Sequence, residues 1–221
     1  MRTSWFIWMV VTVFVALYVG AGSVASRTEK IDIKLEHGYS AQVRAIRLDE
    51  DRLRMRLVFQ GNHIRRPELG IWNTSSDGHE PGTLRFSNPG AAIRIVASAP
   101  GVAPVAYEAM PMSGYGTGTV IRNLTADLSI APGVWRWPPN RNELLLQRGS
   151  NVVSIEVVSV EAPLVGEAVE LAIDPALGFK ATMPNVGWLW LSFLWPILLG
   201  IQVLWAVLLG VQTWRIRREA R

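Results

Sequence analysis

The chain has 221 residues, a net charge of +4 and a hydrophobic content of 49%, which is high for a purely soluble protein. It contains no cysteine, which excludes structural disulfides and thiolate metal sites. Residues 27–185 carry 17 basic and 17 acidic side chains, so the positive surplus lies wholly at the two ends. This distribution argues against a nucleic-acid binder, because such a protein gathers basic residues on a folded unit.

The first predicted element is a transmembrane helix at residues 5–25, behind a short cytoplasmic N-terminus at residues 1–4. The segment has no charged residue and is about as long as the 20 apolar residues that a bilayer core requires. Trp5 and Trp8 lie at its start, where aromatic side chains favour the membrane interface. A second interpretation stays open, because an apolar run followed by Ser23-Val24-Ala25 is also typical of a cleavable signal peptide.

The region between residues 27 and 185 shows the period-two alternation of β-strands. In DRLRMRLVF (51–59), the apolar side chains occupy one face and the arginines the other, and we expect a hairpin with SAQVRAIRL (40–48). The segment EAVELAID (167–174) is expected to turn Val169, Leu171 and Ile173 inward. Further strands are predicted at residues 83–86, 92–98, 142–147 and 151–160. Many short strands separated by Pro-Gly turns predict an all-β sandwich of jelly-roll type.

One stretch of this region resembles a known family. Residues 144–173, LLLQRGSNVVSIEVVSVEAPLVGEAVELAI, follow the pattern L-x-x-G-x-N-x-[VIL]-x-[VIL], and this pattern recurs in the closing strands of galactose-binding-like jelly rolls. The matching positions are Leu146, Gly149, Asn151, Val153 and Ile155. The resemblance implies a fold like that of a carbohydrate-binding module, but it transfers no ligand-binding residue.

The most suggestive candidate site is PGVWRWPPNRNE, residues 132–143. Trp135 and Trp137 are two residues apart and would share a face in an extended chain, while Arg136, Asn140 and Arg141 supply hydrogen-bond donors. A flat aromatic surface with such donors suits stacking on a sugar ring. It equally suits a protein-interface hot spot. The third interpretation is that one or both tryptophans pack on the core.

No catalytic residue, cofactor or metal is predicted, so we do not expect an enzyme. The three histidines, His37, His63 and His79, lack the spacing of a metal site. The glycine-rich segment SGYGTGTV (113–120) lacks the lysine of a phosphate-binding loop and is interpreted as a flexible loop. The acidic residues are scattered singly, although a carboxylate pair drawn from different strands stays open.

A second transmembrane helix is predicted at residues 187–214, with Trp188 and Trp190 at its start and Trp214 at its end. Pro196 lies two turns into this span and predicts a kink. Gln202 lies near the middle of the membrane, where an amide without a partner is costly. We expect it to bond the first span or another membrane protein; the alternative is a bond to its own helix or to water.

The basic tail at residues 215–221 predicts the orientation of the chain. Arg215, Arg217 and Arg218 should remain cytoplasmic by the positive-inside rule, which places the middle region in the periplasm of a Gram-negative cell and the helices in its inner membrane.

The functional hypothesis is therefore a non-catalytic accessory subunit. It would contact membrane lipid and dock on a membrane protein partner, an enzyme or a transporter. Its outer domain would bind a partner protein or an envelope glycan, and not nucleic acid. The alternatives are an envelope carbohydrate-active enzyme that uses acidic residues, and a periplasmic sensor or assembly factor.

Overall fold

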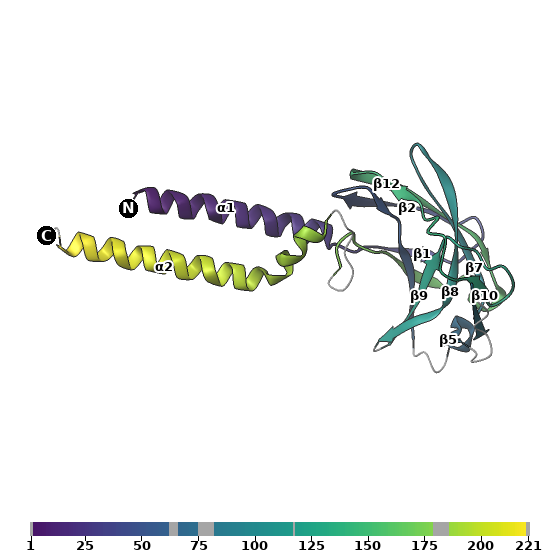
Figure 1. Cartoon of the computed structure of the whole chain (residues 1–221). Helices are drawn as coiled ribbons and strands as arrows, with labels where there is room; N and C mark the ends of the chain where they lie inside the picture. Colours follow the sequence, from purple (N-terminus) through teal and green to yellow (C-terminus); the bar gives the residue numbers. More distant parts are fainter. Residues whose placement is uncertain (1, 62–65, 75–81, 117, 179–185, 220–221) are drawn as a thin grey trace. The chain divides into compact units, whose positions relative to one another are not determined.

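The computed structural model describes residues 2–61, 66–74, 82–116, 118–178 and 186–219. The chain divides into two compact units (Figure 1). The helical unit comprises Met1–Arg27 and Ala176–Arg221, and the β unit comprises Thr28–Pro175. The β unit thus ends at Pro175, ten residues before the predicted limit at residue 185.

The helical unit contains α1 (Arg2–Ala25), the 3-10 helix η4 (Gly187–Leu194) and α2 (Trp195–Glu219). The segments Arg2–Ala25 and Gly187–Glu219 are long and apolar enough to cross a membrane. Pro196 does not lie two turns into an α-helix as predicted, because the 3-10 helix η4 ends at Leu194 and α2 begins only at Trp195. Pro196 therefore occupies the first turn, where its missing N–H removes no intrahelical hydrogen bond.

The β unit is built on one antiparallel eight-stranded sheet in the order β1-β13-β4-β9-β8-β7-β12-β2. Two smaller sheets accompany it, with the orders β10-β6-β5 and β11-β3. The strands are β1 (Glu29–Lys34), β2 (Ser40–Arg47), β3 (Asp51–Arg52), β4 (Met55–Gln60), β5 (Ile71–Thr74), β6 (Thr83–Asn88), β7 (Ile93–Ala99), β8 (Val102–Gly116), β9 (Thr119–Thr125), β10 (Val134–Arg136), β11 (Leu145–Leu146), β12 (Gly149–Val160) and β13 (Ala168–Ile173). Short 3-10 turns, η2 (Pro67–Leu69) and η3 (Ala162–Leu164), lie in its loops.

The large sheet is rolled, because Cα atoms of its two outer strands, β1 and β2, come within 8 Å of each other. The inward side chains of all eight strands form one apolar core. The predicted alternation is confirmed in β13, where Val169, Leu171 and Ile173 are buried. The mainly antiparallel all-β class is therefore confirmed, whereas the jelly-roll topology stays a prediction.

The predicted hairpin between residues 40–48 and 51–59 is wrong. Strand β2 pairs with β12, whereas β4 pairs with β13 and β9. The alternation itself is confirmed, since Leu53, Met55, Leu57 and Phe59 are all buried. Alternation fixes which face of a strand points inward, but it does not determine which strand lies beside it.

Both connections to the helical unit leave the β unit from the same end of neighbouring strands. Glu29, at the start of β1, pairs with Ile173, at the end of β13. The β1–β2 turn lies at the other end, where Gly38 N donates to Val157 O at 2.9 Å, close to the end of β12. The loop residue Glu161 follows β12 directly at this second end.

Candidate ligand-binding cavity

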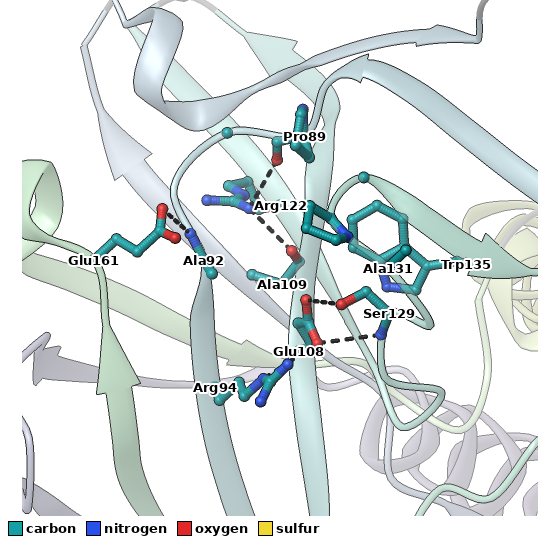
Figure 2. A pocket seen from close by; sticks show the side chains of 13 residues that line it. Pro89, Ala92, Arg94, Glu108, Ala109, Arg122, Ser129, Ala131, Trp135 and Glu161 are labelled. Carbon is teal, nitrogen blue, oxygen red and sulfur yellow. Dashed lines mark hydrogen bonds and ion pairs between the residues drawn. The ribbon is translucent and has the colours of Figure 1, made fainter.

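A partly enclosed cavity of about 380 Å³ lies in the β unit, where β7, β8 and β9 meet the segment that leads into β10. Its polar lining is supplied by a few side chains from separate strands and loops (Figure 2). In that view, Glu161 and Ala92 lie on one side of the cavity, Ser129 and Trp135 on the other, and Arg122 between them.

Arg122 lies on β9 and has an exposed fraction of 0%. Among the described residues its guanidinium donates to four backbone carbonyls: Nε to Met110 O at 2.8 Å, Nη1 to Ala91 O at 2.7 Å, and Nη2 to Ala109 O at 2.9 Å and Pro89 O at 3.3 Å. One buried side chain therefore fixes the loop before β7 against β8. A guanidinium has about five N–H donors, so one of them remains beyond these four bonds.

Burial lowers the pKa of Arg122 to about 10, because desolvation disfavours the charged form. The negative charges of Glu108 and Glu161 oppose this effect. Arg122 therefore remains a cation at neutral pH, and it is one of the residues that line the cavity.

Glu108 lies on β8 and is 4% exposed. Its carboxylate accepts hydrogen bonds from Ser129 Oγ at 2.8 Å and from Ser129 N at 3.2 Å. Arg94, on the neighbouring β7, contributes an ion pair in which Nε lies 3.3 Å from Glu108 Oε2. These contacts tie the segment that precedes β10 to the large sheet and close one wall of the cavity (Figure 2).

Trp135, on β10, forms the wall beside Ser129 and is 3% exposed. Its ring packs edge-to-face on Phe86, with 5.4 Å between the ring centroids. Its indole Nε1 is buried and has no hydrogen-bond acceptor among the residues that the structure describes. A buried donor without a partner is costly, and the described residues of the β unit supply no acceptor for this N–H.

The charges around the cavity balance. Arg94 and Arg122 contribute two positive charges, and Glu108 and Glu161 contribute two negative charges. Glu161 accepts a hydrogen bond from Ala92 N through Oε2 at 2.8 Å. Within the described parts of the chain, His, Asp and Glu form no cluster of three that could hold a metal ion. The cavity therefore offers donors and acceptors side by side without a net charge.

The predicted surface with both tryptophans is wrong, because Trp135 is buried whereas Trp137 is 52% exposed. Strand β10 ends at Arg136, so the two-residue alternation does not continue to Trp137. Arg136, Asn140 and Arg141 are exposed and do not line the cavity. Packing on the core was one of the open interpretations for Trp135; the structure buries its ring against Phe86 in the small sheet β10-β6-β5.

Gln202 is buried in the helical unit and bonds the first helix. Thr12 Oγ1 lies 3.1 Å from Gln202 Oε1, and Trp8 Nε1 donates to Gln202 O at 3.1 Å. The two predicted partners of Gln202 were the first span and another membrane protein; in the structure, Gln202 contacts the first span. Gly22, on α1, also lies close to the 3-10 helix η4, which precedes α2. A Cβ built on Gly22 would lie 1.9 Å from Ser192 Oγ.

The predicted interface residues lie at the two ends of the second span. Trp188 O accepts a hydrogen bond from Tyr18 Oη at 2.6 Å. The rings of Trp190 and Phe193 lie 6.5 Å apart. At the other end, the guanidinium of Arg218 lies 4.7 Å from the Trp214 ring centroid. Arg215 and Arg217 are exposed on the last turns of α2.

Sequence reasoning missed Arg122 and Glu108. A signal for Arg122 was present, since TVIRNLT (119–125) alternates and puts an arginine between the inward positions Val120 and Leu124. The expected loop at residues 113–120 is instead mostly strand, with β8 running to Gly116 and β9 starting at Thr119. His37 is exposed with Nδ1 2.5 Å from Val158 O, whereas His63 and His79 lie outside the described residues.

Comparisons with known proteins do not assign the chain to a family. No protein-family model matches it, and no curated protein matches it. A crystal structure of a protein from Sulfurospirillum deleyianum is similar at 16% sequence identity, with a TM-score of 0.39; the match covers 67% of this chain and 97% of that protein.

Proposed function

We propose that the protein is a non-catalytic accessory subunit of the bacterial cell envelope, anchored in the membrane by α1 and α2. Its β unit binds an extracytoplasmic ligand in the cavity between Arg122, Glu108 and Trp135. The observation that carries the proposal is the cavity of about 380 Å³ itself, whose lining brings charged side chains of both signs together: Arg94, Glu108, Arg122 and Glu161.

The rigidity of the cavity supports a binding role. Arg122 and Glu108 are held by hydrogen bonds to the β unit itself, so the walls of the cavity are already in place before a ligand arrives. Such preorganisation reduces the entropy that is lost on binding. The remaining donors and acceptors would determine the orientation of the ligand, as in most concave sites.

The location at the inner membrane, with the β unit in the periplasm, is part of the proposal. Its support is the two apolar spans and the arginines that follow Trp214. The jelly-roll likeness belongs to it as well. Asn151 is consistent with that motif, because its side chain closes the turn before β12 by donating to Gln147 O at 2.8 Å.

In-cell photocrosslinking tests the binding role. A photoreactive amino acid replaces Ala131, which is exposed and lines the cavity, and a matched control replaces Trp137, which is exposed and does not line it. We expect a discrete adduct from the first position only. Equal labelling from both positions, or no adduct from either, would contradict a ligand site at the cavity.

The enzyme hypothesis keeps one specific support, since two carboxylates, Glu108 and Glu161, line the same cavity. Such a pair is the machinery of glycoside hydrolysis. The hypothesis predicts that Glu108→Gln and Glu161→Gln each abolish turnover of an envelope glycan while the ligand still binds. The accessory-subunit proposal predicts that no turnover is measured in the unmodified protein.

A further inference from the structure

We infer that the helical unit carries a docking groove for a second copy of this chain, in which the Gln202 amides of the two copies bond each other. This inference goes beyond the proposed function of the β unit, and it shares with that proposal only the premise that α1 and α2 lie in a membrane.

The docking groove runs along one side of the seam between α1 and α2. One hollow of about 180 Å³ is lined by Thr12 and Ala16 of α1 and by Gln202 of α2. A second hollow of about 230 Å³ continues the first, because Val19 and Trp195 line both. The lining of the second hollow is rich in small residues, which let the backbone of another helix approach closely: Gly22, Ser23, Ser26 and Ser192.

The side chain of Gln202 brings a hydrogen-bond donor to this groove. The residue is 8% exposed, and its Nε2 donates no hydrogen bond to the described residues. Nε2 is not one of the fully buried unpartnered atoms of the described chain, so a group in the groove can reach it. Thr12 does not saturate the amide, since its single hydroxyl proton is shared between Gln202 Oε1 at 3.1 Å and Trp8 O at 2.8 Å.

The membrane itself does not supply the acceptor that this amide requires. Gln202 lies about midway between Trp188 and Trp214, the aromatic residues near the two ends of the second span. Acyl chains fill an apolar groove at this depth, but they offer no hydrogen-bonding group, and water is excluded. The occupant that satisfies the amide is therefore a transmembrane helix with a polar group at the depth of Gln202.

A second copy of the chain meets this requirement through its own sequence. Two copies have the same orientation in the membrane, so a two-fold axis along the membrane normal brings equivalent residues to the same depth. A primary amide carries donors on its nitrogen and more than one acceptor position on its oxygen. Each Gln202 Nε2 therefore donates to Gln202 Oε1 of the second copy, while Oε1 keeps an acceptor position for Thr12 of its own chain.

Cysteine crosslinking of the full chain in native membranes tests the docking face, because the chain has no cysteine of its own. Leu199→Cys places a thiol in the groove beside Gln202. Leu198→Cys is the matched control at nearly the same depth, since Leu198 lines a different hollow of the helical unit. A disulfide requires the two Cα atoms to come within about 7 Å, so oxidation should link two copies through Leu199→Cys and not through Leu198→Cys.

Resonance energy transfer between labelled copies then measures the contribution of the amide. The dyes are attached to a cysteine that replaces the exposed Glu219, and the full chain is studied in liposomes at increasing lipid dilution. Gln202→Leu should weaken association by about tenfold to a hundredfold, because two hydrogen bonds between helices are lost. Thr12→Val is the control: it removes the amide's partner within the chain but leaves the amide in the groove, so it should associate at least as well as the unmodified chain. Circular dichroism checks that each variant is helical.

Three outcomes would overturn this inference. The first is a chain that stays monomeric at every lipid ratio, whichever other helix then fills the groove. The second is equal crosslinking at Leu198 and Leu199, or unchanged association of Gln202→Leu, because the groove and its amide would then not form the contact. The third is an equal loss of association in Thr12→Val, which would mean that both residues act through the pairing of α1 with α2. None of these outcomes affects the proposed cavity of the β unit, which photocrosslinking at Ala131 tests independently.

Discussion

The side chains of Thr12 and Gln202 join two helices across 190 positions of the sequence, with 3.1 Å between Oγ1 and Oε1. The apolar interior of a membrane offers no water to an amide, so a polar contact here stabilises the pairing of α1 with α2. Without α1, the buried Gln202 amide would lose this partner. Only a retained anchor keeps this contact, so we predict that the N-terminal sequence of the mature protein includes Thr12; a mature chain that begins after Ala25 would contradict this prediction.

A double-mutant cycle measures the coupling between these two side chains. We expect Thr12→Val and Gln202→Leu to be coupled by about 0.6 kcal/mol, and by at most about 1.7 kcal/mol, as for other hydrogen bonds between membrane helices. The measurement is reversible unfolding of the helical unit within the full chain in bicelles. As a control, Val203→Leu, on an exposed position of α2, should show no coupling to Thr12→Val. Equal coupling in both cycles would contradict a specific contact.

The close approach of Gly22 to Ser192 predicts a strong effect of one added methyl group. Gly22→Ala should weaken the pairing of the two segments by about 1–3 kcal/mol, because overpacking forces neighbouring atoms apart. Gly20→Ala is the matched control, since a Cβ there would meet nothing within 4 Å. Ser192→Gly should restore the stability of the Gly22→Ala chain. Unfolding in bicelles measures all four, and equal effects at Gly20 and Gly22 would refute the contact.

Arg122→Met is expected to destabilise the β unit by about 3 kcal/mol or more, because several buried carbonyls would lose their donor at once. The comparison is Arg44→Met on β2, whose side chain is exposed and whose replacement should cost at most about 1 kcal/mol. Urea unfolding followed by far-UV circular dichroism measures both. Similar losses for the two variants would mean that Arg122 is not the structural centre of the cavity.

Tyr107 predicts a loss of stability at alkaline pH. Burial raises the pKa of its hydroxyl well above the ordinary value of 10.0, while Tyr107 Oη donates to Leu53 O at 3.1 Å. A pKa that is higher in the folded state gives stability that is complete below the unfolded pKa and is lost as the pH rises above it. The unmodified chain should therefore lose more stability than Tyr107→Phe between neutral pH and pH values above about 10. If the free energy of unfolding changes equally with pH in the two chains, the raised pKa of Tyr107 is contradicted.

The proposed orientation predicts where a reporter is active. Alkaline phosphatase fused behind Arg218 should be inactive, because this enzyme requires export, whereas a fusion at the β1–β2 turn should be active. Replacing Arg215, Arg217 and Arg218 by glutamate should reduce correct insertion, since the positive-inside bias at this end would be lost. Activity of the fusion behind Arg218 would overturn the orientation.

Local patterns predicted the spans and several strands, but they failed where distant contacts decide the structure. Leu57 and Leu171 are buried as their alternation indicates, and their strands are indeed neighbours. The long strand β8 was not predicted, because Pro111 and Gly114 interrupt its pattern. The structure accommodates both through register shifts between Ala109 and Met112 and between Met112 and Gly114.

The cavity could not be predicted from the sequence, because its residues come from separate parts of the chain. Arg122 and Glu108 come from neighbouring strands, but Trp135 and Glu161 arrive from separate parts of the chain. A tryptophan beside prolines and arginines is compatible with an exposed surface and with a buried wall. Only the pairing of β10 with β6 decides between them, and it places Trp135 against Phe86.

The pairing of Glu29 with Ile173 also determines how the β unit responds to mechanical load. Strand β1 is an outer strand that bonds β13 alone, and each strand is joined at the same end to one membrane span. A force that separates the two spans would act across this ladder and open its hydrogen bonds one after another, the weakest direction of pulling. The hydrogen bond from Leu177 N to Ala25 O, at 2.9 Å, joins the two connecting segments between the spans and this pair, so such a force would have to break it before it reached the sheet.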